Sequence, residues 1–321
     1  METVSVNRKK CNGCGLCVQV CPHRLFAVTA GAASVTAEGC MGCGHCQAVC
    51  PSGAVEIDGL PAALDFRHIP EKLEALAPGS YDCGSLVQLI RSRRSCRNYT
   101  SRRVELDLLE DLVKVGTTAP SGTNSQSWNF VILPERQDVE ILGGLTADFY
   151  RRLNRQAANP LYRLLARFVA GDALGRYYRN YYASVAGAIR EWDEHRIDRL
   201  FHGAVAAILV TGSREAGCPG EDAVLATQNI LLAAHALGLG SCLIGFAVEA
   251  MRRDRRIKKV MAIPGDEEIY TVIALGYPAF RYQRVSGRRP VHPRVLHLAA
   301  GRRAAGENDR MAERQVGDDH S

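Results

Sequence analysis

The sequence has no run of about eighteen or more apolar residues, which is what a membrane-spanning helix requires. Its longest apolar stretch, residues 204–210, has the length of a buried strand instead. Charged residues precede the first cysteine (Glu2, Arg8, Lys9, Lys10), and no apolar segment typical of a secretory signal follows them. We therefore expect a cytoplasmic protein without a membrane span.

The sequence also has little excess charge. Its 40 Lys and Arg residues are nearly balanced by 34 Asp and Glu residues, which leaves a net charge of +6. A nucleic-acid-binding protein usually carries a stronger and more clustered basic bias, so we expect no nucleic-acid partner. Nucleotide-binding motifs are missing as well, because Gly238-Leu239-Gly240 is a lone glycine pair and there is no P-loop. No triad or general base stands out, so the chemistry is assigned to a bound cofactor and no side chain is assigned as catalytic.

What the sequence has in abundance is cysteine, with 12 residues. Eight of them form two copies of one motif: Cys11-x-x-Cys14-x-x-Cys17-x-x-x-Cys21-Pro22 and, twenty-nine residues later, Cys40-x-x-Cys43-x-x-Cys46-x-x-x-Cys50-Pro51. This spacing is the signature of two 4Fe–4S clusters, and it does not match the spacing of a structural zinc site. A disulfide framework is not expected in a reducing compartment.

In this motif the fourth cysteine of each run ligates the other cluster. We therefore predict that one cluster is held by Cys11, Cys14, Cys17 and Cys50, and the second by Cys40, Cys43, Cys46 and Cys21. The arrangement resembles that of bacterial two-cluster ferredoxins over about fifty residues. We interpret His23 and His45 as bystanders, and the remaining cysteines as inert thiols: Cys83, Cys96, Cys218 and Cys242.

The chain is long enough for two domains. Residues 1–58 form the predicted two-cluster domain, with strands at 25–28 and 54–57. Residues 59–85, rich in proline and glycine, are predicted to be a linker with one short helix at 71–76. Residues 86–300 form the second predicted domain. Residues 301–321 mix charges without an apolar period, which predicts a disordered tail.

Apolar patterns predict the elements of the second domain. We expect helices at 86–91, 106–115 and 222–237, helical structure through 145–199, and strands at 127–133, 204–211 and 270–275.

Three separated segments of this domain have the residues of a phosphate- and ring-binding site. Residues 91–99 contain arginines and a serine that can hold a phosphate dianion. Residues 119–128 contain a Pro-Ser-Gly turn followed by Asn124 and Gln126, whose amides suit the edge of a flavin ring. Residues 238–246 are rich in glycine, which would let the backbone approach a planar cofactor. Each segment alone also fits a solvated surface, an ordinary loop or a core strand.

In this order, the three segments resemble the nitroreductase family of FMN enzymes. Asp222-Ala-x-x-Ala226-x-Gln228-Asn229 and Leu275-Gly276-Tyr277-Pro278 match the same family, and the resemblance covers about residues 86–295. Ser127 departs from it, because proline is usual there, and so does the long Arg- and Tyr-rich segment 145–200. The resemblance implies an α+β fold with an antiparallel sheet and flanking helices, and a homodimer with FMN at each subunit interface.

The resemblance also implies FMN-binding roles by position. The phosphate would be held by Arg93, Arg94, Ser95 and Arg97, with Arg288 and Arg289 completing the phosphate clamp. Asn124 and Gln126 would contact the ring edge, and Pro120 and Ser121 would approach it from the partner subunit. The backbone near Ile244 and Gly245 would lie against the ring.

We therefore predict an iron–sulfur flavoprotein oxidoreductase. Electrons would pass from reduced ferredoxin or a similar low-potential donor through both clusters to FMN, and then to a small organic acceptor such as a nitroaromatic, a quinone or an activated alkene. An electron-transfer adaptor subunit of a larger redox complex and an NAD(P)H-dependent flavin reductase are the alternatives. Segment 145–200 is interpreted either as a substrate lid or as packed helices. In a lid, its aromatic residues would stack on a flat acceptor: Tyr162, Tyr177, Tyr178, Tyr181, Tyr182 and Trp192.

Overall fold

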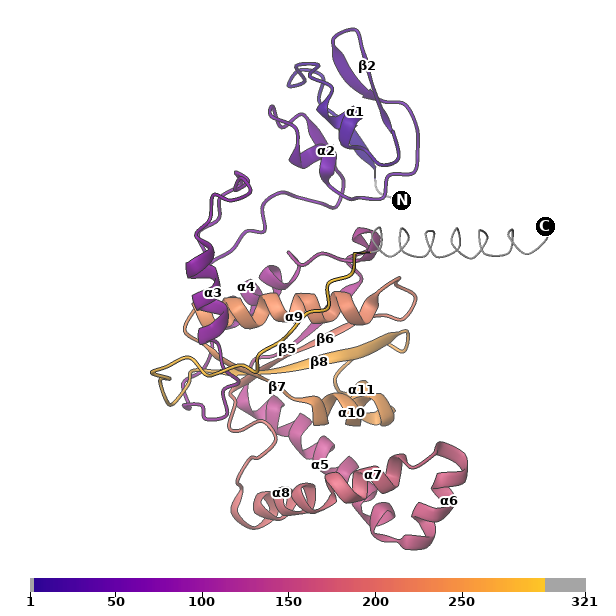
Figure 1. Ribbon diagram of the computed structural model, residues 1–321, viewed down its shortest axis with the longest axis vertical. Coiled ribbons are helices and arrows are strands. Elements are labelled where there is room, and N and C mark those ends of the chain that lie inside the picture. Colours follow the sequence, from indigo (N-terminus) through magenta and orange to yellow (C-terminus); the bar gives the residue numbers. More distant parts are fainter. Residues whose placement is uncertain (1–2, 298–321) are drawn as a thin grey trace, which may run out of the picture. The chain divides into compact units, whose positions relative to one another are not determined.

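The computed structural model describes residues 3–297 of the 321-residue chain (Figure 1). Residues up to Arg284 belong to one compact unit, and the chain from Val285 onward belongs to a second. The predicted tail, residues 301–321, lies outside the described residues. No helix in the described part of the chain is long and apolar enough to cross a membrane.

Two antiparallel strand pairs and two short helices build the N-terminal part of the first unit. β1 (Val4–Val6) pairs with β4 (Val55–Ile57), and β2 (Phe26–Thr29) pairs with β3 (Ala32–Val35). α1 (Leu16–Val20) and α2 (His45–Ala48) each begin directly after a glycine of the cysteine motif. β2 and β4 confirm the strands predicted at 25–28 and 54–57, whereas β1 and β3 have no counterpart in the sequence-based prediction.

The connector after β4 is irregular. Residues 60–80 contain no helix or strand, so the helix predicted at 71–76 is wrong. Leu73 and Leu76 are 64% and 73% exposed, so such a helix would have no apolar surface to pack against, and short isolated helices are unstable in water. Buried Asp111 anchors the connector instead, because its carboxylate accepts hydrogen bonds from the backbone N–H groups of Arg67 (3.0 Å) and His68 (2.7 Å).

A four-stranded antiparallel sheet forms the centre of residues 128–276. Its strands, in spatial order, are β5 (Trp128–Leu133), β6 (Ala206–Ser213), β8 (Glu267–Gly276) and β7 (Gly240–Leu243). Nearly all of β6 is buried, because helices cover both faces of the sheet, and this explains its continuous apolar sequence. The predicted strands at 127–133, 204–211 and 270–275 and the predicted α+β fold are confirmed.

One face of the sheet is covered by α4 (Leu106–Gly116) and α9 (Pro219–Ala236), as Figure 1 shows. Leu109 and Ile230 of these helices pack against Ile208 and other strand residues. The helix predicted at 86–91 is α3 (Cys83–Ser92). Asp82 caps its N-terminus, because the Asp82 carboxylate accepts hydrogen bonds from the backbone N–H groups of Gly84 and Ser85.

The other face is covered by α5 (Arg136–Ala158), α10 (Gly245–Arg253) and α11 (Arg255–Val260). Leu142 and Met251 of these helices are fully buried in the core on this face.

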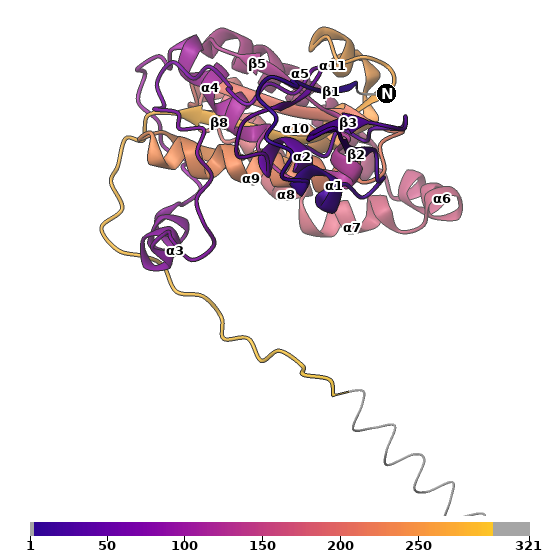
Figure 2. The ribbon, with the colours of Figure 1, turned by 90° about the horizontal axis from the view of Figure 1, so that it is seen from above.

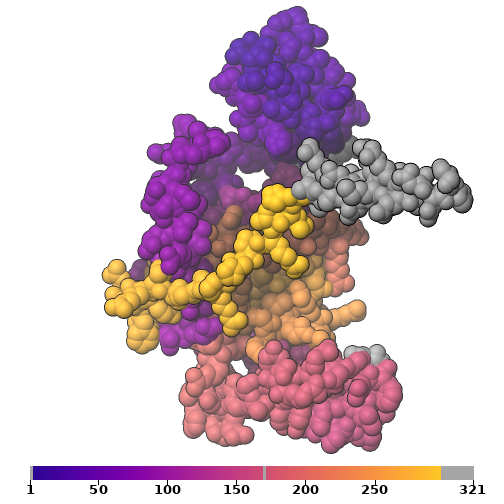
Figure 3. Space-filling model, viewed as in Figure 1, coloured from indigo at the N-terminus to yellow at the C-terminus, as the bar shows by residue number. Residues whose placement is uncertain are grey.

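Three further helices, α6 (Pro160–Ala170), α7 (Ala173–Asn180) and α8 (Tyr182–His195), follow α5. They pack mainly on one another and on α5 rather than on the sheet. Seen from above, α6 and α7 lie to one side of the sheet (Figure 2), and the space-filling view shows this segment, in pink, at the molecular surface (Figure 3). The helical structure predicted for 145–199 is confirmed as far as His195.

Candidate functional site

The eight motif cysteines gather into two groups of four. Cys11, Cys14, Cys17 and Cys50 line one small cavity, and Cys21, Cys40, Cys43 and Cys46 line another. Each group contains three cysteines from one motif and the fourth cysteine of the other motif, as the sequence predicts. Within residues 3–297, no three His, Cys, Asp or Glu side chains converge as they would around a single metal ion. The four thiols of each group surround a cavity, and a thiol set of this kind fits an iron–sulfur cube.

Backbone geometry positions these thiols. Gly13 has a φ of +72°, and a Cβ there would lie 2.4 Å from the carbonyl oxygen of Gly31, so only glycine fits. Several thiols also accept backbone hydrogen bonds, including Cys50 from Ala54 (3.2 Å) and Cys11 from Ala33 (3.3 Å). Such hydrogen bonds to sulfur help to set the reduction potential of a cluster.

The surroundings of the thiols shift their pKa values. Burial raises the pKa of Cys46 to about 11, and burial also raises the pKa of Cys17. Burial raises the pKa of Cys50 too, but hydrogen bonds from Ala54 and Ser52 outweigh it and leave the pKa below its ordinary value. Because iron binds the thiolate form, cluster assembly must displace protons from the buried thiols.

The first and third predicted FMN segments lie side by side. Ser95 forms a parallel bridge with Ser241 in β7, and the N–H of Cys96 donates to the carbonyl of Ser241 at 2.9 Å. Gly240 permits this approach, because a Cβ there would lie 2.7 Å from the Cβ of Cys96. The arginine-containing segment is therefore held against the β7 edge of the sheet.

These segments form one wall of a large cavity of about 1050 Å³. Of the predicted FMN residues, Arg97, Ile244 and Gly245 line it. No atom lies within 4 Å of the place where a Cβ on Gly245 would sit, so its backbone is open to a ligand. No ion pair among residues 3–297 involves Arg97, which leaves its guanidinium available to an anion. A planar group bearing a phosphate fits this set of donors.

Another part of the cavity wall is aromatic. Tyr150 and Tyr177 stack with ring centroids 6.2 Å apart, Tyr177 and Tyr181 are 6.3 Å apart, and Phe246 meets Tyr181 edge-on at 5.9 Å. These four aromatic residues line the cavity, and so does Arg176. Of the aromatic residues of the predicted lid, Tyr177 and Tyr181 therefore line the cavity. Tyr178 and Tyr182 do not, and they pack on each other with ring centroids 4.9 Å apart. Tyr177 and Tyr181 have the same four-residue spacing as Tyr178 and Tyr182. Only the orientation of α7 decides which pair lines the cavity.

Three residues of the cavity wall had no role assigned from the sequence. Phe246 directly follows Gly245, and Tyr150 donates a hydrogen bond from its hydroxyl to the carbonyl of Phe246 (3.2 Å). His202 also lines the cavity, and burial lowers its pKa, so it stays neutral at neutral pH. A lone aromatic residue in a helix gives no sequence signal that separates a cavity wall from core packing.

The second predicted segment does not join this cavity. Pro120, Ser121, Asn124 and Gln126 are all absent from its walls, since they belong to the loop before β5, at the opposite edge of the sheet from β7. In this loop the hydroxyl of Ser121 accepts the N–H of Gln126 (3.0 Å). The Nδ2 of Asn124 donates a hydrogen bond to the carbonyl of Gly42 at 2.5 Å. Gly42 lies between Cys40 and Cys43 in the sequence.

The remaining predicted phosphate ligands are placed differently. Arg93 is half-buried and Arg94 is exposed. The pKa of His235 is lowered mainly by burial of its own ring and further by the charge of Arg93. Arg288 belongs to the second unit, where its guanidinium donates to Ser286 (2.8 Å) and to the carbonyl of Gly287 (3.0 Å). Arg289 is an exposed residue of the same unit.

Comparison with known proteins identifies the larger part of the chain. Residues 90–277 match the family model described as the nitroreductase family. The chain belongs to the nitroreductase family. Residues 3–51 match a 4Fe-4S dicluster domain. This nitroreductase is therefore an FMN-dependent oxidoreductase that carries two 4Fe–4S clusters at its N-terminal end.

Several individual proteins are similar to the nitroreductase-family region of the chain. The nitroreductase-family region is 29% identical over 188 residues to a protein named NADH dehydrogenase from Thermus thermophilus, covering 58% of this chain and 83% of that protein. It is 26% identical over 226 residues to a 4-nitrobenzoate reductase from a Nocardioides strain, covering 65% and 88%. A solved nitroreductase with bound FMN from Bacteroides fragilis is similar with a TM-score of 0.46 and 20% identity, covering 66% of this chain and 97% of that one.

Proposed function

We propose that this nitroreductase passes electrons from an external low-potential donor, which docks at its N-terminal part, to a small organic acceptor bound in the large cavity. The carrying observation is that one chain combines two four-thiol cavities with a nitroreductase-family domain. When bound, the clusters exchange single electrons and FMN exchanges one or two, so together they suit a one-electron donor and a two-electron acceptor. Reduced ferredoxin is the donor class that a built-in ferredoxin-like part favours.

The contact between Asn124 and Gly42 supports this proposal. The Nδ2 of Asn124 donates to the backbone of the Cys40–Cys43 loop at 2.5 Å. It therefore ties the second thiol group to the loop that the family resemblance assigns to flavin binding. Backbone N–H groups that donate to sulfur would help to hold the thiolates of Cys11, Cys21, Cys40 and Cys50 in place.

A homodimer completes the site in this proposal. The loop with Pro120 and Ser121 lies at the β5 edge of the sheet, whereas Arg97 and Gly245 lie by the β7 edge. One chain keeps these edges apart, so a second copy is needed to bring the loop to the cavity. We propose that Arg93, Arg94, Ser95 and Arg97 hold the phosphate and that Ile244 and Gly245 lie against the ring. Asn124 and Gln126 would contact the ring edge, and Pro120 and Ser121 would approach it from the partner subunit.

The acceptor would lie beside the flavin position and against the aromatic part of the cavity wall. Tyr177 and Tyr181 offer flat faces for stacking. No ion pair among residues 3–297 involves Arg176, so the cavity has a positive charge beside its aromatic wall. These features suit an electron-poor ring such as a nitroaromatic or a quinone, and an activated alkene conjugated to a carbonyl would fit the same wall. The name of the Nocardioides relative, a 4-nitrobenzoate reductase, agrees with a nitroaromatic acceptor.

An anaerobic reductive titration tests the proposal. Protein purified without oxygen should contain about eight iron atoms and bound FMN. Reduced ferredoxin should bleach the cluster absorption and the flavin absorption in the same protein, and adding nitrobenzoate or benzoquinone should restore both. Cys43→Ser is the control, because it removes one cluster ligand and leaves the large cavity unchanged. If FMN stays oxidised while the clusters are reduced, the proposed electron path is wrong.

A second candidate function is an NAD(P)H-dependent flavin reductase. The Thermus relative, named NADH dehydrogenase, favours it. Stopped-flow mixing with NADH or NADPH separates the two candidate functions. Fast flavin bleaching by either nucleotide would identify that nucleotide, rather than ferredoxin, as the donor. Electron exchange with ferredoxin but no reduced organic product would instead indicate an electron-transfer adaptor subunit.

The proposed location is the cytoplasm. All cysteines in the structure are unpaired, and cluster ligation requires reduced thiols, which a reducing compartment maintains.

A further inference from the structure

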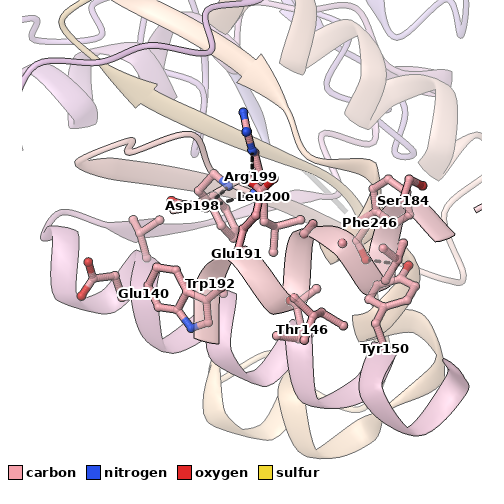
Figure 4. Close-up of a pocket in the computed structure, with 18 residues that line it drawn as sticks. Glu140, Thr146, Tyr150, Ser184, Glu191, Trp192, Asp198, Arg199, Leu200 and Phe246 are labelled. Atoms are coloured by element: carbon pink, nitrogen blue, oxygen red, sulfur yellow. Dashed lines mark hydrogen bonds and ion pairs between the residues drawn. The ribbon is translucent and has the colours of Figure 1, made fainter. Parts of the chain in front are cut away.

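A second cavity, of about 440 Å³, lies between α5, α8 and residues 198–201 (Figure 4). We call it the side cavity. It exists because small residues line the facing sides of the two helices: Gly143 and Ala147 on α5, and Gly187 and Ala188 on α8. Thr146 and Tyr150 of α5 and Trp192 of α8 project around it (Figure 4). Its volume lies within the range of small-molecule sites, which runs from about 300 to 1,000 Å³.

Every charged side chain in its wall already has a partner. Glu140 and Asp198 both pair with Arg136, at 2.9 and 3.0 Å, and Arg199 pairs with Glu191 at 2.5 Å. A charged ligand would therefore find no unpaired countercharge, and burying an uncompensated ion is strongly unfavourable. The side cavity therefore favours an uncharged ligand.

The hydroxyl groups of the wall are engaged as well. Thr146 donates to the carbonyl of Leu142 (2.8 Å), Ser184 to that of Tyr181 (2.9 Å) and Tyr150 to that of Phe246 (3.2 Å). With these donors used, the wall offers a ligand mainly apolar and aromatic surface. The ligand that suits it is apolar as well as uncharged.

The side cavity shares part of its wall with the large cavity. Tyr150, Arg199, Leu200 and Phe246 line both. Phe246 is the residue after Gly245, so the shared wall stands directly beside the proposed flavin position. For a molecule whose reactive ring lies in the large cavity, this shared wall is where an apolar substituent would enter the side cavity.

We propose that the side cavity binds an apolar substituent of the acceptor, and that the acceptor is a quinone carrying an alkyl or similar uncharged chain. This inference rests on the proposed function. The quinone takes up two electrons and two protons to become the hydroquinone; the electrons come from the reduced low-potential donor and the protons from solvent. Each buried methylene strengthens binding roughly fourfold, so a short chain gives a large preference.

Binding is tested first, without chemistry, by calorimetric titration of oxidised holoenzyme with n-hexylbenzene and with hexanoate. We expect n-hexylbenzene to bind and hexanoate not to bind. Gly187→Leu should abolish binding by filling the cavity; no atom lies within 4 Å of the place of its Cβ, so the helix can accept the larger residue. Gly144→Leu is the matched control, because Gly144 has equally open surroundings on α5 but does not line the side cavity.

Turnover is tested next with benzoquinone and n-hexylbenzoquinone. Gly187→Leu should raise the KM for n-hexylbenzoquinone at least about tenfold and leave kcat and the KM for benzoquinone unchanged. Ala188→Leu, with its melting temperature recorded, is the second variant if Gly187→Leu does not fold. Three outcomes would overturn the inference. The wild type and both filled variants could bind n-hexylbenzene equally, or hexanoate could bind tightly. Alternatively, n-hexylbenzene could fail to bind, as when a second copy of the chain fills the space. Binding of n-hexylbenzene with no quinone reduction by any variant would overturn the proposed function and the acceptor assignment, and leave only the apolar site.

Discussion

Gly240→Ala is the substitution whose effect the structure specifies most closely. Gly240 is a buried residue at the start of β7. An added Cβ would lie 2.7 Å from the Cβ and 2.8 Å from the Sγ of Cys96, and 3.4 Å from the ring of Tyr99. The Cβ of Cys96 cannot move aside alone, because its backbone N–H is bonded to Ser241 at 2.9 Å. The whole segment with Ser95 must therefore shift.

The expected loss of stability follows from this crowding. Overpacking of a filled core typically lowers the free energy of unfolding by about 1–3 kcal/mol. Replacing glycine by alanine restricts the unfolded chain and returns about 0.4–1 kcal/mol. The net loss is about 1.3 kcal/mol and at most about 2.6 kcal/mol, so the melting temperature should fall by about 3–5 °C, and by at most about 10 °C, for a domain of this size. Because Ser95 and Arg97 move with Cys96, FMN affinity should fall as well.

Thermal melts of the FMN-free and FMN-loaded protein, with a fluorescence titration of FMN, measure both effects. Gly144→Ala is the control, because nothing lies within 4 Å of the added Cβ and alanine favours a helix. Adding Cys96→Gly to Gly240→Ala should recover part of the loss, since it removes both crowded atoms. A Gly240→Ala protein that melts and binds FMN like the wild type would refute the idea that this close packing holds the arginine segment.

Three further predictions concern the cluster ligands, a partly buried carboxylate and a proposed phosphate ligand. The double variant Cys14→Ala/Cys50→Ala should retain about four iron atoms per chain, because both cysteines belong to one cluster. The double variant Cys14→Ala/Cys21→Ala should lose both clusters, because each cysteine belongs to a different one. Equal iron loss in the two double variants would contradict the crossed assignment. Burial raises the pKa of Asp198, but hydrogen bonds from the backbone of Gly203 and Phe201 and from Arg136 outweigh it and leave the pKa below its ordinary value. Its stabilising effect is therefore complete above pH of about 4 and is lost as the pH falls through the folded-state pKa. Asp198→Asn should cost about 1–3 kcal/mol at neutral pH and make chemical unfolding less sensitive to acid, and an unchanged acid dependence would count against this role. Arg97→Ala should weaken FMN binding roughly ten- to hundredfold, the equivalent of about 1.5–3 kcal/mol for a charge-assisted hydrogen bond, and an unchanged Kd would exclude Arg97 as a phosphate ligand.

Local patterns determined much of this protein from its sequence alone. The cysteine spacing predicted the two groups of four, because a chain that wraps a small inorganic core has few ways to place ligands three residues apart. The strand β6 and the helices α4 and α9 followed from apolar patterns that burial imposes on one chain segment at a time. The helix expected at 71–76 failed for the converse reason, since Leu73 and Leu76 have the right spacing but nothing to pack against.

Only the tertiary structure decided what depends on distant neighbours. The sheet order places the loop of Asn124 and the segment of Arg97 at opposite edges, and no local pattern specifies which strands become neighbours. The side cavity arises because small residues on α5 and α8 happen to face each other, and it adjoins the large cavity through Tyr150 and Phe246. Packing between segments far apart in the chain creates such spaces, so their position and chemistry are set by the fold as a whole.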